Sequence, residues 1–147
     1  MAHVRKTIRD NVTTTLTGLT TTGSRVYQTR LFPLATAKLP GLCIYTSSEN
    51  TEYATIGRPR TQIRQLEVVV EAYVKGASNL DDTIDTISVE VEEAIAADPS
   101  RGGGAKDTQI TGFDVEYDGD GDQSVGVARF TISVTYVTVE NDIEAAA

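Results

Sequence analysis

The sequence contains very few of the residues that support catalysis or covalent cross-linking. It has one cysteine, Cys43, and one histidine, His3, among its 147 residues. A single cysteine excludes a disulfide within the chain and fits a reducing compartment. Without a Cys/His cluster there is no zinc-site pattern, and a lone histidine on a solvated segment is a poor general base. These absences predict a protein that is not an enzyme and uses no cofactor.

Long apolar stretches are also missing from the sequence. No run approaches the ~18 residues of a membrane helix, and residues 1–16 lack the apolar centre of a signal peptide. The chain has the length of one ordinary domain, enough to bury about 70% of the surface that its unfolded form exposes. We therefore expect one soluble intracellular domain, residues 1–147, with no contact with a membrane.

Acidic and basic residues are unevenly divided along the chain. The net charge is −8, but residues 1–66 contain nine Lys/Arg against three Asp/Glu, and residues 67–147 contain four against eighteen. An acidic balance argues against general nucleic-acid binding, which needs a basic footprint. The division fits a molecule with one basic and one acidic surface that contacts copies of itself head to tail, unless folding mixes the charges in space.

Two segments have the apolar spacing of an amphipathic helix. Residues 3–19 and 78–98 each place apolar side chains three or four positions apart; these are Val4, Ile8, Val12, Leu16 and Leu19 in the first, and Leu80, Ile84, Ile87, Val91, Ala94 and Ile95 in the second. Ser78 and Asp81 have the spacing of a capping box at the start of the second helix. Both helices are expected to pack on a sheet.

Five segments have the composition or the alternation of β-strands. They are residues 24–34, 39–48, 63–75, 110–117 and 125–139. The third, with Glu67, Glu71 and Lys75 on one face, is expected to be half-solvated. The predicted fold is α+β, a mostly antiparallel sheet with two helices on one face, in the order α-β-β-arm-β-α-β-β. Residues 48–62 lack a period and are predicted to form a protruding loop or arm, and residues 140–147 a short flexible tail.

The stretch YDGDGDQSVG places aspartates at alternate positions between two predicted strands. Asp118, Asp120 and Asp122 match the first three ligand positions of a calcium-binding EF-hand loop. Gln123 stands where that loop needs glycine, and Arg129 stands where it needs a bidentate glutamate. Asp-Gly pairs between alternating strands indicate a hairpin turn. We therefore predict a hairpin tip and no metal site within the chain, with weak divalent binding by these aspartates at a subunit seam as the alternative.

Three stretches resemble one family of viral structural proteins. RVY…RLFPL…LPGLCIYT, the segment LDDTIDTISVEVEEAI and the closing GVARFTISVTY stand in the order found in the minor tail protein U type of tail terminator of long-tailed bacteriophages. The resemblance extends from about Arg5 to Thr138 and includes no catalytic motif. It rests on the order and texture of the elements.

The resemblance implies assembly. Members of this family form a ring, usually of six copies, at the head-proximal end of the tail tube, where the ring stops tube polymerisation and offers a surface for head–tail joining. The implied partners are other copies of the chain, the tail tube protein and a neck or head-completion protein, with DNA only as cargo passing through the bore. The implied location is the tail of the virion, assembled in the host cytoplasm.

Two groups of residues are the candidates for contacts in such an assembly. The arm residues are expected to contact a neighbouring subunit or the tube; they are Glu49, Glu52, Tyr53, Arg58, Arg60 and Arg64. The acidic loop with Asp118, Asp120 and Asp122 is expected at the bore or at a subunit seam, because a basic lumen would hold DNA phosphates. Alternatives are that the arm is an ordinary mobile loop, that the chain is a tube subunit or head–tail connector, or that it is a small ligand-binding α+β domain.

Overall fold

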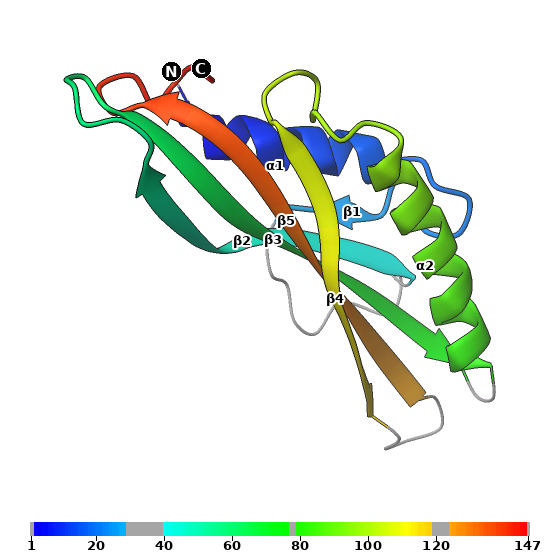
Figure 1. Cartoon of the computed structure of the whole chain (residues 1–147). Helices are drawn as coiled ribbons and strands as arrows, with labels where there is room; N and C mark the ends of the chain where they lie inside the picture. The colour runs from blue at the N-terminus through cyan, green and yellow to red at the C-terminus, as the bar shows by residue number, and fades with distance from the viewer. Residues whose placement is uncertain (1, 29–39, 77–78, 119–123, 147) are drawn as a thin grey trace.

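The computed structural model describes residues 2–28, 40–76, 79–118 and 124–146. The chain forms a twisted five-stranded sheet with two helices on one face (Figure 1). The elements are α1 (Val4–Leu16), β1 (Val26–Tyr27), β2 (Gly41–Tyr53), β3 (Thr61–Gly76), α2 (Leu80–Ala96), β4 (Asp107–Asp118) and β5 (Ser124–Val139). The predicted α+β class and the predicted element order are confirmed.

Strand β3 is the centre of the sheet, whose order is β1-β2-β3-β5-β4. The short β1 pairs with β2 in parallel, and the other pairs are antiparallel. Strand β3 pairs with β5 along its whole length, from Thr61 opposite Val139 to Gly76 opposite Ser124. Bulges interrupt β2 between Thr46 and Ser48 and β4 between Ile110 and Gly112. Bulges bend a strand and increase its twist.

The main core lies between the helices and the sheet. Each helix buries one stripe, which consists of Val4, Ile8, Val12 and Leu16 in α1 and of Ile84, Ile87, Val91 and Ile95 in α2. The matching sheet positions on β3 are Leu66, Val68, Val70, Ala72 and Val74. Burial of each larger side chain contributes about 1.5–3 kcal/mol. Gly126 of β5 lets α2 approach closely, since a Cβ there would lie 3.2 Å from the Ile84 side chain.

The second face of β3 is buried over part of its length, which corrects the expectation of a half-solvated strand. Val69, Glu71 and Tyr73 are almost inaccessible to solvent. Tyr73 packs with Cys43 in a small second cluster. Glu71 is tolerated there because its carboxylate accepts a hydrogen bond from the Arg129 guanidinium at 2.9 Å, and buried charges require a partner.

The helix starts differ from the sequence prediction. His3 is the N-cap of α1, and its Nδ1 accepts a hydrogen bond from the Arg5 amide at 3.0 Å, so it is not simply a solvated residue. Helix α2 begins after Asn79, which makes no side-chain cap; the predicted cap Ser78 lies outside the described residues. Acidic side chains do occupy the first turn of α2, where the helix dipole favours them.

The arm and the tail are more regular than predicted. Residues 48–53 continue β2, and residues 61–62 begin β3, so the arm is a β-hairpin whose loop is only residues 54–60. The Arg60 carbonyl accepts a hydrogen bond from the Glu140 amide at 2.9 Å, and the Ile143 carbonyl accepts one from the Val4 amide at 3.0 Å. Residues 140–143 therefore connect the arm to the start of α1 and do not form a free tail.

The hairpin predicted around the aspartates is present. Strands β4 and β5 pair up to Asp118 opposite Val125. Asp120 and Asp122 lie outside the described residues. Their predicted place at a bore or seam stays a prediction.

Candidate functional site

The base of the arm contains a charged cluster next to the N-terminal turn of α1. Glu49 of β2 is the central acceptor: its carboxylate accepts hydrogen bonds from Arg5 at 3.0 Å, from Arg64 at 2.9 Å and from the Tyr136 hydroxyl. The Glu49 side chain is 7% exposed and the Arg64 side chain 11%. A carboxylate at this depth is stable only because each of its oxygens has a hydrogen-bond donor.

Arg64 extends this cluster across the sheet. Its Nε donates to Thr138 Oγ1 at 2.9 Å and its Nη2 to Gln62 Oε1 at 2.8 Å. Burial, together with the Glu49 carboxylate, raises the pKa of Tyr136 above its usual value. Tyr136 is therefore a protonated donor at neutral pH. The cluster joins β2, β3, β5 and α1 where the apolar core ends.

Two residues of this cluster belong to the set that the sequence predicts to contact a neighbouring subunit or the tube. Glu49 and Arg64 are paired inside the chain, and neither presents its charged group freely to a partner. A sequence signal for this placement exists, because Arg64 lies two residues before Leu66 on β3 and thus on the face that the helices cover. Their predicted contact with another subunit stays a prediction.

The tip of the arm is exposed. Ile56 is 98% exposed and Tyr53 is 54% exposed. The Arg60 guanidinium lies over the Tyr53 ring, 5.2 Å from its centroid, a cation–π arrangement. Arg58 and Glu52 are exposed as well. Four of the predicted interface residues thus lie at or beside the tip.

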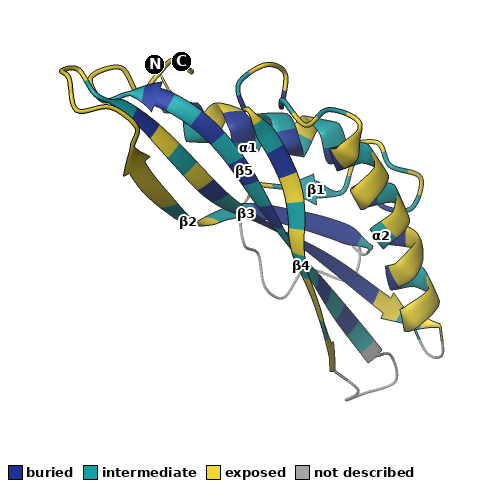
Figure 2. Cartoon of the chain, in the orientation of Figure 1, coloured by how far each residue is buried: buried dark blue, intermediate teal, exposed yellow. Residues whose placement is uncertain are grey.

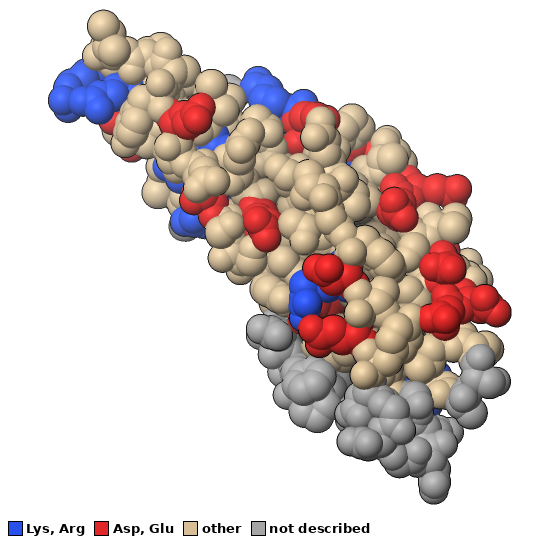
Figure 3. Space-filling view, turned by 60° about the horizontal axis from the view of Figure 1, so that its bottom comes forward, with Lys and Arg blue, Asp and Glu red and all other residues tan. Residues whose placement is uncertain are grey.

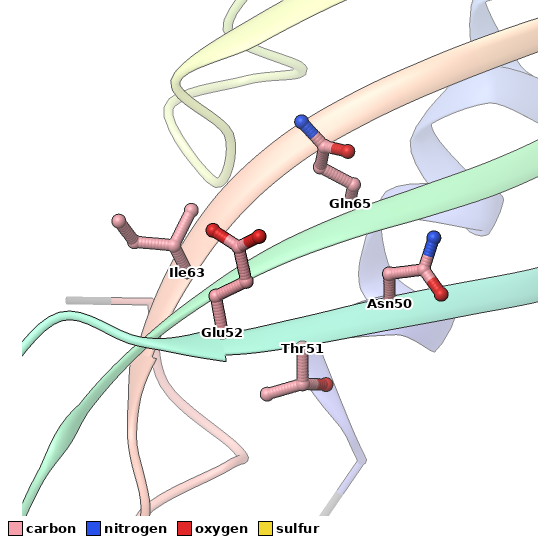
Figure 4. A pocket seen from close by; sticks show the side chains of 5 residues that line it. All are labelled: Asn50, Thr51, Glu52, Ile63 and Gln65. Atoms are coloured by element: carbon pink, nitrogen blue, oxygen red, sulfur yellow. The ribbon is translucent and has the colours of Figure 1, made fainter.

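The side of the sheet opposite the helices, here called the open face, is polar along the arm. Figure 4 shows Asn50, Glu52, Ile63 and Gln65 on this side of the hairpin and Thr51 on the other. These residues border a shallow hollow of about 330 Å³. A second hollow, lined in part by Ser48, Glu67 and Ser133, lies in the neighbouring part of this face.

Acidic side chains outnumber basic ones on the open face. Strand alternation and register assign to it the acidic residues Glu52, Glu67, Glu71, Asp107, Asp114 and Glu116, and the basic residues Lys75 and Arg129. Arg129 is bound to Glu71, so its charge is locally balanced. The rest of the exposed part of this face consists largely of Ser, Thr, Asn and Gln side chains, as burial along the strands shows (Figure 2).

The described residues contain no grouping typical of a metal centre. Nowhere in residues 2–28, 40–76, 79–118 and 124–146 do three His, Cys, Asp or Glu side chains gather in a way that could hold a metal ion. Cys43 is buried, as expected from its apolar strand. None of the helices in the described part of the chain has the length and apolar character needed to cross a bilayer.

The chain is similar in fold to a solved structure and matches no family model. No curated protein sequence matches it. Among solved structures, a similar chain belongs to one titled "Virion of native gene transfer agent (GTA) particle". The two chains are 15% identical with a TM-score of 0.44, and the match covers 90% of this chain and 92% of that chain. A likeness of this degree does not assign a role.

Proposed function

We propose that the chain is a structural virion protein, a tail terminator that forms a ring at the head-proximal end of a phage tail tube. In this role the ring stops tube polymerisation and offers a surface for head–tail joining. The proposal draws on the sequence resemblance from about Arg5 to Thr138. The element order on which that resemblance rests is the order of the folded chain.

The observation that carries the proposal is the open face of the sheet. Within the described residues, helices cover one side of the sheet only (Figure 1), and the exposed part of the other side presents small polar and acidic groups on β2, β3, β5 and β4. A surface of small polar and acidic groups binds DNA phosphates weakly, because affinity for DNA comes mainly from Lys and Arg. Facing the bore of a ring, the open face would let DNA pass without holding it.

The proposed partners follow from this role. Copies of the chain, six in the family that it resembles, form the ring; the tube protein meets one rim, and a neck or head-completion protein meets the other. The proposed location is the virion tail, and no cofactor or catalytic step is required. The acidic loop with Asp118, Asp120 and Asp122, which connects β4 to β5, would lie at the bore of the ring or at a seam between subunits.

Electron microscopy of the concentrated protein, with and without magnesium, tests the proposal. Closed rings one subunit thick with an open centre are expected. Open-ended filaments would instead identify a tube subunit, and particles that remain single at every concentration would contradict self-assembly. A change in ring stability with magnesium would indicate that the aspartate-rich hairpin binds a shared cation.

Thiol accessibility tests which face lines the bore. The native Cys43 is buried, so an introduced cysteine gives the signal. In Gln65→Cys, on the exposed part of the open face, we expect rings to react with a small maleimide but much more slowly with a polymer-linked one, while separated subunits react with both. Lys6→Cys, on the exposed side of α1, is the control and should react with both reagents in either state. Equal reaction of Gln65→Cys with the polymer reagent in rings would place the open face outside the bore.

A further inference from the structure

The tip of the arm has the composition of a binding surface, although it packs against little of its own chain. It combines an almost fully exposed isoleucine, Ile56, with the half-exposed ring of Tyr53 and the guanidinium groups of Arg58 and Arg60. Tyrosine and arginine around an apolar centre are typical of the residues that dominate binding energy at protein interfaces. Such a tip is costly to leave in water and would be stabilised by contact with a complementary surface.

The outer face of α2 is complementary to the arm tip both in charge and in its apolar centre. Val89 is 55% exposed on the side opposite the buried stripe of this helix. Around it stand the exposed acids Asp85, Glu92 and Glu93, each three or four residues away, with the exposed Asp82 a further three residues before Asp85 on the same side of the helix. No hydrogen bond or ion pair joins their carboxylates to another described residue. The face is an apolar centre inside a ring of negative charge.

The two surfaces cannot meet within one molecule. The arm tip follows Tyr53 and precedes Thr61 at one end of β3, whereas α2 follows the other end of β3 at Gly76. A strand of 16 residues is roughly 50 Å long. Figure 1 shows the tip and α2 on opposite sides of the molecule, and in Figure 3 a large basic patch lies at one end while acidic atoms are most numerous toward the other. The unequal division of charge along the sequence is therefore also a division in space at these two surfaces, because the arm tip is basic and the outer face of α2 is acidic.

We propose that the arm tip of one copy docks on the outer face of α2 of the next copy, with Ile56 against Val89 and Arg58 and Arg60 among the surrounding carboxylates. This contact rests on the proposed ring and names the surfaces that join its subunits. Because the two surfaces differ, the contact is heterologous and repeats head to tail, which closes into a ring when the rotation between copies allows it. Charge complementarity guides the approach, and the apolar pair excludes water at the centre.

Charge reversal tests the contact. The arm variant is Arg58→Glu with Arg60→Glu, and the helix variant is Glu92→Arg with Glu93→Arg. Each alone should raise the concentration needed for assembly at least about tenfold, equivalent to about 1.4 kcal/mol, as measured by mass photometry. A chain with both pairs reversed should assemble again. So should an equal mixture of the two variants, because each reversed arm then finds a reversed helix on an alternate neighbour.

The control variant is Lys6→Glu with Lys106→Glu. It changes the net charge by as much as the arm variant does, at exposed positions outside both surfaces, and should assemble like the original chain. Thermal unfolding of every variant shows whether it is folded. Neither surface contributes to the core, so all melting temperatures should agree within a few degrees.

The outcomes separate this contact from the proposed function. Rings that form equally well from every variant would overturn the contact and leave the ring intact. Single reversals that block assembly without rescue by the double reversal would also overturn it, since the two surfaces would then bind different partners. An original chain that never forms closed rings would overturn both. Loss in each single variant with rescue in the combination would establish the contact.

Discussion

The two halves of strand β3 are built on different principles. From Leu66 to Val74 the side under the helices is entirely apolar and buried, and part of the opposite side is buried too. From Thr61 to Gln65 the same two sides hold a hydrogen-bonded charged cluster and an exposed polar surface. One strand thus passes from a core into an arm (Figure 2). Apolar burial stabilises the first half, and specific charge pairing positions the second.

The largest effect is expected in the apolar half. Leu66→Ala removes a fully buried side chain and should lower the free energy of unfolding by about 2–5 kcal/mol, because a cavity remains. Denaturant unfolding measures the loss. The matched control is Ile63→Ala, three residues earlier and on the open face, where the loss should stay below about 1 kcal/mol. Similar losses at both positions would mean that the arm half also has an apolar core.

A smaller but clear effect is expected at the base of the arm. Glu49→Gln leaves Arg64 and Arg5 without a negative partner and should lower the free energy of unfolding by about 1–3 kcal/mol, the usual cost of an unsatisfied buried group. Glu52→Gln, on the exposed open face of the same strand, is the control and should change it by less than about 0.5 kcal/mol. If both substitutions are neutral, the charged cluster does not hold the arm.

The pH dependence of the α1 cap should be weaker. Burial, followed by the nearby Arg5 charge, lowers the pKa of His3 below 6.5. The folded chain thus favours neutral His3, and the stability this gives is present above pH 6.5 and lost as the pH falls through the lowered pKa. Unfolding measured between pH 7 and pH 5 should show a smaller decrease for His3→Asn, which keeps a capping side chain. Equal slopes for both proteins would show that His3 titrates normally.

The smallest effect on folding is expected at the arm tip. Ile56→Ala changes a side chain that is 98% exposed, so the free energy of unfolding should stay within about 0.5 kcal/mol of the original. Assembly should nevertheless weaken measurably in mass photometry if Ile56 packs on a neighbouring copy. If the concentration needed for assembly is unchanged, Ile56 makes no apolar contact between copies.

Periodicity predicted the elements because it reflects burial directly. The stripes of α1 and α2 and the alternation of β3 and β5 each place apolar groups on one side of the element. Because apolar groups are excluded from water, that side must face the core in any fold that buries them. The arm was predicted less well. Residues 48–53 are polar on both sides, so no alternation marks them as strand, and only pairing with β3 makes them one.

The sequence by itself determined the α+β class, the element order and the two helical stripes, because these depend on local spacing of apolar residues. It also determined the unequal division of charge along the chain. Only the tertiary structure decided where that charge is neutralised and where it is left exposed. Glu49 and Arg64, 15 residues apart, meet because two long strands pair, whereas Arg58 and the carboxylates of α2 are held at opposite ends of the same sheet. The distances between such charged groups are set by the length and pairing of the strands. The local pattern of residues carries no information about these distances.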